Sequence, residues 1–143
     1  KVPTHIFFGQ LFVQVGTERI EPLGNQILEG PEDTARFEGY RDPRSGFVAY
    51  VPPGSIRKGQ ALATTGGNGR TVACGTCHGA DLRGMGPIPA IAGRSASYLA
   101  RQLNDFRTGA RHGAWSSLMK AATENLTDDD ILVLSAYAAS LAP

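Results

Sequence analysis

This sequence of 143 residues lacks both long hydrophobic runs and an excess of either charge. Its 14 Lys and Arg residues nearly balance 13 Asp and Glu residues, and the net charge of +1 gives no general attraction for nucleic acid or anionic membrane. The longest apolar-rich stretch, IFFGQLFVQV at 6–15, is too short to cross a bilayer and is interrupted by Gln10 and Gln14. We therefore expect no transmembrane segment and no nucleic-acid partner.

The chain changes character at YVPPGSI (50–56), where two prolines and a glycine predict a turn. We place a boundary after Gly54. Residues 1–54 are predicted to form a loop-rich extension that packs on the main domain, can hold a short hairpin and uses Phe37 and Tyr40 as anchors. Residues 55–143 are predicted to form the main domain.

Helical signals dominate the main domain. Ser55 can cap a first helix that ends at the glycines of TTGGNG (64–69). A second helix begins at Ser95 or Ser97, shows apolar residues at three- and four-residue steps, and stops at Gly109. These patterns predict an all-α domain.

The last helix has the clearest start. Thr127 is followed by three aspartates, a capping-box-like sequence that places negative charge at the positive end of the helix dipole. One apolar face then runs to the C-terminus through Ile131, Leu134, Tyr137, Ala138 and Leu141. A shorter helix is predicted to begin near Trp115.

Cysteine is scarce, and both copies lie in one motif, CGTCH, which ends in His78. A thioredoxin-like dithiol would need alternating strands and helices around it, and a structural zinc site would need four ligands, whereas His5 and His112 stand at no zinc-site spacing. Covalent haem attachment needs two thiols three positions apart and an adjacent imidazole. The motif predicts one haem c, attached through Cys74 and Cys77, with a disulfide or buried thiol pair as the alternative.

If His78 is one axial ligand of the haem iron, four side chains are candidates for the other: Met85, Met119, His5 and His112. Met85 follows His78 by only seven residues, a short path around the edge of a haem ring. Met119 lies much further along the chain and is favoured. Met85, His112 and an open or water-bound site remain alternatives.

Arginines and an aromatic residue supply further candidates near a haem. Arg94, Arg101, Arg107 and Arg111 are partly at helical spacing, which is typical of a solvated helix face. In a haem protein, Arg94 is a candidate partner for a propionate, and Trp115 is a candidate for the border of the pocket. No Ser-His-Asp set or pair of catalytic carboxylates is apparent, so we expect no enzyme.

The region from about 55 to 143 resembles the small class I c-type cytochromes of bacteria. Ordered pieces carry the resemblance: a helix before CGTCHG, then PAIAG (89–93), YLARQLNDFRTGAR (98–111), Met119 and LTDDDILVLSAYAASL (126–141). The resemblance implies the class I fold, in which helices pack around one covalently attached haem. It does not extend to residues 1–54.

Carried over residue by residue, the resemblance implies that Cys74 and Cys77 are the thioether anchors. It implies that His78 is the proximal ligand, Met119 the distal ligand, and the Pro89 carbonyl the acceptor for the ring N–H of the proximal histidine.

Gly59 and Tyr137 match positions where the first and last helices of the family cross closely.

The implied function is electron transfer between redox protein partners in the periplasm, by a protein that is a monomer by default. The N-terminus shows no secretory signal, so a mature form whose signal has been removed is expected. Two alternatives stay open: an electron-transfer subunit of a larger dehydrogenase or oxidase, and a haem protein whose sixth site binds ligands.

Overall fold

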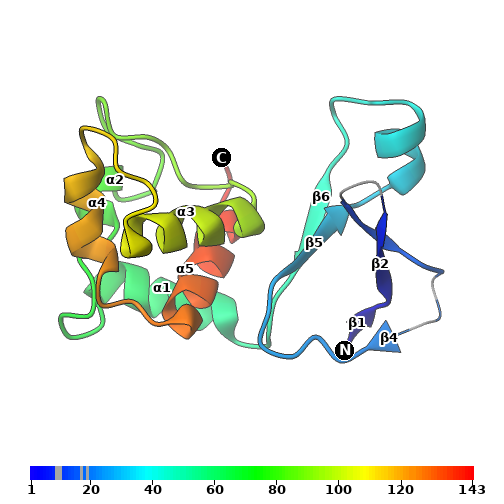
Figure 1. Ribbon diagram of the computed structural model, residues 1–143, viewed down its shortest axis with the longest axis horizontal. Coiled ribbons are helices and arrows are strands. Elements are labelled where there is room, and N and C mark those ends of the chain that lie inside the picture. The colour runs from blue at the N-terminus through cyan, green and yellow to red at the C-terminus, as the bar shows by residue number, and fades with distance from the viewer. Residues whose placement is uncertain (9–10, 17, 19) are drawn as a thin grey trace. The chain divides into compact units, whose positions relative to one another are not determined.

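The structure, a computed structural model, describes every residue except 9–10, 17 and 19, and it consists of two compact units, Lys1–Pro52 and Pro53–Pro143 (Figure 1). The boundary between the two units along the chain falls inside the proline-rich turn. That the first unit packs on the second stays a prediction.

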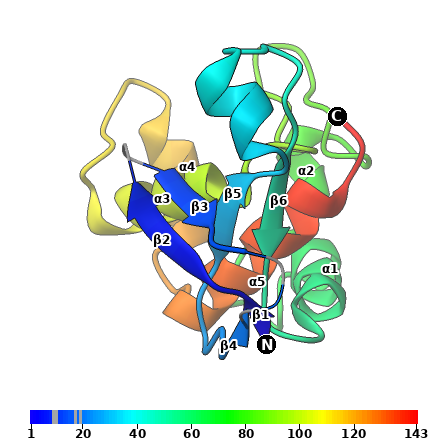
Figure 2. The same cartoon turned by 90° about the vertical axis from the view of Figure 1, so that its right-hand side faces the viewer.

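Strands make up much of the first unit, where they pair antiparallel as β1 with β4, β2 with β3, and β5 with β6 (Figure 2). Their bounds are β1 (Val2–Pro3), β2 (His5–Phe8), β3 (Leu11–Gln14), β4 (Ile20–Glu21), β5 (Leu28–Pro31) and β6 (Phe47–Tyr50). Aromatic and β-branched residues favour such pairing, as where the Phe7 and Phe12 rings meet edge to face at 5.5 Å. The all-α expectation therefore applies to the second unit only, and the first holds more than one short hairpin.

A small apolar core supports the first unit. Val2, Leu23 and Leu28 are buried together, and Tyr50 packs against them. The predicted anchor Tyr40 is instead 81% exposed, directly after a short π-helical turn, η1 (Ala35–Gly39). Tyr40 is therefore no part of the core of this unit, and the prediction that it is an anchor was wrong.

Five helices make up the described elements of the second unit: α1 (Ser55–Thr65), α2 (Gly75–His78), α3 (Ala96–Thr108), α4 (Ser116–Thr123) and α5 (Asp128–Ser140). The predicted helix ends are confirmed where Gly66 and Gly109 take positive φ angles and where the Ser95 hydroxyl accepts the Tyr98 N–H. Ser55, however, is the first helical residue and is buried, while Gly54 holds the capping position. In the described part of the chain no helix is long and apolar enough to cross a membrane.

Helix α5 forms the centre of the second unit. It packs against α1 on one side and α3 on another, so its buried residues surround most of its axis rather than forming one stripe. They are Asp130, Ile131, Leu132, Val133, Leu134, Ser135, Ala136 and Ala138. The apolar face predicted from sequence included too few residues. A helix that packs against one neighbour shows one apolar stripe, whereas α5 packs against both α1 and α3.

Helices α1 and α5 cross at Gly59, as the resemblance implied. A Cβ atom at Gly59 would lie 1.9 Å from the Val133 carbonyl oxygen and 2.8 Å from the Tyr137 Cβ. Only glycine permits this approach of one backbone to another.

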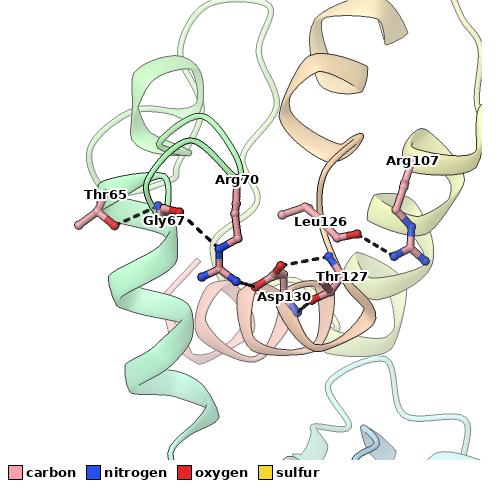
Figure 3. A network of polar contacts seen from close by, with 7 residues as sticks. All are labelled: Thr65, Gly67, Arg70, Arg107, Leu126, Thr127 and Asp130. Atoms are coloured by element: carbon pink, nitrogen blue, oxygen red, sulfur yellow. Dashed lines mark hydrogen bonds and ion pairs between the residues drawn. The ribbon is translucent and has the colours of Figure 1, made fainter.

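Polar contacts fix the start of α5 (Figure 3). Thr127 and Asp130 form the predicted capping box, with hydrogen bonds of 3.1 and 3.0 Å. The buried Asp130 carboxylate also accepts a hydrogen bond of 2.6 Å from Arg70, in the loop after α1. Arg107 of α3 donates to the Leu126 carbonyl at 2.9 Å. Three segments distant in sequence are thereby held at one helix end.

We expect Gly59→Ala to lower the free energy of unfolding by about 2 kcal/mol or more, because the added methyl overlaps the α5 backbone. Gly113→Ala is the control, since a Cβ there would meet only the Ser116 hydroxyl, at 3.7 Å, and should change stability by less than about 0.5 kcal/mol. Chemical unfolding followed by circular dichroism measures both. Equal losses in the two variants would contradict the close crossing.

Candidate haem site

The CGTCH motif forms the single turn α2 and its lead-in. The Cys74 carbonyl accepts hydrogen bonds from the backbone N–H groups of Cys77, at 3.3 Å, and His78, at 3.0 Å. The Cys74 N–H donates to the Ala63 carbonyl at 2.8 Å, which ties the motif to the end of α1. Burial raises the pKa of the Cys74 thiol, whereas Cys77 is exposed. The turn therefore presents two thiols and an imidazole from one short, anchored segment.

His78 is oriented by a backbone carbonyl. Its side chain is buried, and Nδ1 lies 2.8 Å from the Pro89 oxygen. With Nδ1 donating this hydrogen bond, Nε2 is the ring nitrogen left for a metal. The structure thus brings His78 and Pro89 together. Their arrangement is that of a metal-binding histidine and the carbonyl group that orients it.

The loop after α2 shapes this contact through Gly84, a residue that the sequence analysis missed. Gly84 has a φ of +88°, and its N–H donates to the His78 carbonyl at 2.8 Å. A Cβ on Gly84 would lie 2.6 Å from the Ile88 oxygen and 2.8 Å from the Ala90 nitrogen. The segment carrying Pro89 thus passes directly over Gly84. The sequence RGMGPIP does not show which of its two glycines is needed for this approach.

Three of the four candidate distal ligands lie in local contacts, among them His5, whose Nδ1 lies 2.6 Å from the Pro3 oxygen. Met85 exchanges backbone hydrogen bonds with Ile88, so it belongs to the loop that supplies Pro89. His112 is exposed, and its Nδ1 lies 3.0 Å from the Ala110 oxygen. His5 lies in the first unit, on β2.

Met119 lies on α4, a helix that begins directly after Trp115. Helices α2 and α4 lie at the same end of the second unit, toward the C-terminal end of α3 (Figure 1). Met119 is half-buried and Trp115 is 64% exposed.

The arginines singled out from the sequence do not all lie on one solvated helix face. Arg107 bridges α3 to the start of α5 through the Leu126 carbonyl and the Asp128 carboxylate, at 2.9 and 2.7 Å. The Arg111 guanidinium lies 4.5 Å from the centre of the Phe106 ring. The exposed Arg94 donates from Nε to the Ala90 oxygen at 3.4 Å.

The residues present fit a haem better than a zinc ion. Among the described residues, no group of three or more His, Cys, Asp and Glu side chains converges as a metal cluster would. Thiols, an oriented imidazole and a thioether are instead the donors that c-type haem uses. Large exposed apolar side chains in the second unit suit a flat apolar ring, and they include Val72, Met85, Tyr98, Trp115 and Leu118.

Comparison with known proteins gives a family. Residues 56–142 match the Cytochrome c family. Cytochrome c-554(548) of Halomonas halodenitrificans is 40% identical over 68 residues, which cover 47% of this chain and 82% of that protein. Cytochrome c4 of Stutzerimonas stutzeri is 33% identical over 128 residues, covering 85% of this chain and 57% of that protein. A thiosulfate dehydrogenase electron acceptor of the same species is 42% identical over 81 residues, covering 54% and 36%.

Solved structures agree on the fold. Cytochrome c4 of Acidithiobacillus ferrooxidans aligns with a TM-score of 0.56 and 34% identity, over 61% of this chain and 49% of that chain. Thiosulfate dehydrogenase from Marichromatium purpuratum aligns with a TM-score of 0.52 and 39% identity, over 62% and 19%. The chain therefore spans about half or less of these two structures. Because the family match covers well over half of the sequence, the chain belongs to the cytochrome c family, as a class I c-type cytochrome that transfers electrons through c-type haem.

Proposed function

We propose that this chain is an electron carrier with one haem c, held by thioether bonds to Cys74 and Cys77. His78 and Met119 are its axial ligands. The hydrogen bond between His78 Nδ1 and the Pro89 oxygen carries the proposal, because it orients an imidazole that directly follows two thiols. A single CGTCH motif in the sequence supports one haem.

When bound, haem c supplies a one-electron couple between ferric and ferrous iron. The chain's own residues tune that couple. Donation from Nδ1 to Pro89 makes the His78 imidazole more basic and fixes its orientation. The thioether of Met119 favours the reduced state, so the pair of ligands supports a higher potential than two histidines would.

Ligation on both sides favours a carrier over an enzyme. With His78 and Met119 as ligands, no axial position is left for a substrate. The exposed apolar side chains Trp115 and Leu118 are proposed to cover part of the haem once it is bound, and exclusion of water would also favour the reduced state. Arg94 is proposed as a partner for a haem propionate.

The redox partners are proposed to be periplasmic proteins, because the thioether bonds of such cytochromes are made outside the cytoplasm. Relatives named thiosulfate dehydrogenase electron acceptor and cytochrome subunit of sulfide dehydrogenase support a second candidate, a subunit that accepts electrons from a dehydrogenase. Exposed rings such as Phe7, at 67%, support contact of residues 1–54 with a protein partner. Native co-purification of a dehydrogenase distinguishes a subunit from a free carrier.

The test of the ligand assignment is the visible spectrum with and without carbon monoxide. The wild-type protein should show c-type bands that carbon monoxide leaves unchanged after reduction, and a thioether-to-iron band in the ferric state. Met119→Ala should lose that band and bind carbon monoxide readily, because its sixth site is open. Met85→Ala is the matched control, since it removes the other methionine and should leave both properties unchanged.

Three results would refute parts of the proposal. Rapid carbon monoxide binding by the wild-type protein would mean an open sixth site. Loss of the thioether band in Met85→Ala alone would assign the ligand to Met85. Absence of haem bands in protein from a host that matures c-type cytochromes would refute haem attachment.

We expect Gly84→Ala to move the reduction potential to a more positive value. The added methyl pushes the Pro89 carbonyl away from His78, and the less basic imidazole then stabilises the ferric state less. Gly86→Ala is the matched control, because Gly86 also has a positive φ, of +58°, yet a Cβ there meets nothing within 4 Å. Redox titration measures both variants, and equal shifts would show that backbone strain alone is responsible.

A further inference from the structure

The side chain of Thr71, which precedes the CGTCH motif, is hydrogen-bonded to the helix that carries Met119. The Thr71 hydroxyl lies 2.6 Å from the Ala122 carbonyl oxygen, in the last turn of α4. Its other contact, with the Val72 oxygen, is longer at 3.3 Å. A hydroxyl has one proton to donate, so the geometry assigns that proton to Ala122.

The end of α4 explains why this donor matters. The last carbonyl groups of a helix have no partner within the helix, and α4 ends at Thr123. Backbone N–H groups that follow reach the Lys120 and Thr123 oxygens, at 2.9 and 3.1 Å. Thr71 supplies the donor for Ala122, which lies between them.

Thr71 itself is held in place on the α1 side. The Thr71 N–H donates to the Gly66 carbonyl at 3.1 Å. A Cβ at Gly66 would lie 2.5 Å from the backbone carbonyl oxygen of Thr71. The preceding residue, Arg70, is bonded to the buried Asp130 at the start of α5 (Figure 3). The Thr71 hydroxyl is therefore a fixed point rather than the end of a loose loop.

We propose that Thr71 is a positioning residue for Met119, which holds the last turn of α4 so that the thioether stays directed at the iron. Met119 lies three residues before Ala122 in the same helix, and its own carbonyl accepts the Thr123 hydroxyl at 2.9 Å. Thr71 lies three residues before Cys74. One short segment thus links the haem-attachment turn to the distal ligand. The proposal rests on the proposed ligation by Met119.

The test is competition with free imidazole, which binds ferric iron only when the thioether leaves. A less firmly held Met119 raises the apparent affinity for imidazole. We expect Thr71→Val, which keeps the size and removes the donor, to bind imidazole roughly three- to tenfold more tightly than the wild type. Thr71→Ser, which keeps the hydroxyl, should restore most of the difference.

Thr108→Val is the matched control, because the Thr108 hydroxyl bonds carbonyls of its own helix and, among the described residues, reaches no other element. It should leave imidazole binding unchanged. Thr71→Ala is the second variant should the valine disturb folding, and it should bind imidazole as tightly as Thr71→Val. Unfolding by denaturant is measured in parallel, because a purely structural role of Thr71 would lower stability without changing imidazole binding.

Unchanged imidazole affinity in Thr71→Val and Thr71→Ala, with the thioether band present, would overturn this proposal and leave the ligand assignment intact. Absence of the thioether band in the wild-type protein, or its persistence in Met119→Ala, would refute ligation by Met119 and the positioning role with it. The two failures are thereby distinguished.

Discussion

Gly59 lets α1 lie so close to α5 that a single added methyl group would overlap the Val133 carbonyl. The CGTCH segment, the proposed site of haem attachment, depends on this contact. The position of α1 fixes Ala63, whose carbonyl receives the Cys74 N–H and so sets where α2 begins. From there a single turn directs His78 toward the loop that carries Pro89. Close packing far from the reacting atoms thus decides the orientation of an imidazole.

Helix α4, which carries the proposed distal ligand Met119, is held by polar bonds as well as by packing against α3. Thr123 is the only residue of α4 that is buried, and it bonds within its own helix. A hydrogen bond from Thr71 to the Ala122 carbonyl connects α4 to the loop after α1, and Arg70 connects that loop to the buried Asp130. Asp130 is buried whereas Arg70 is about half exposed, and removing Arg70 would leave the buried carboxylate without its ion-pair partner. These bonds therefore make the loop before the motif part of the site.

The first unit is built on different principles. Its strands are short, its core is formed by Val2, Leu23 and Leu28, and several aromatic rings lie at its surface. Small units bury a smaller fraction of their surface, so their cores are limited. Contiguous exposed apolar side chains are a common property of surfaces that meet other proteins.

The sequence by itself determined those features of the protein that depend only on residues close together along the chain. The spacing in CGTCH specified the haem chemistry, and residues such as Ser95, Gly109 and Thr127 marked the helix ends, because capping and turn formation are local. The strand pairing of the first unit was underestimated, since pairing over a distance leaves only a weak trace in single segments.

Tertiary structure alone decided which residues hold the site. Gly84 lies under the Pro89 segment, Thr71 bonds to α4 across 51 positions of sequence, and Arg70 reaches Asp130 across 60. The physical reason is that hydrogen bonds and steric contacts act through space. Residues distant along the chain become partners only after α1, α3 and α5 have packed.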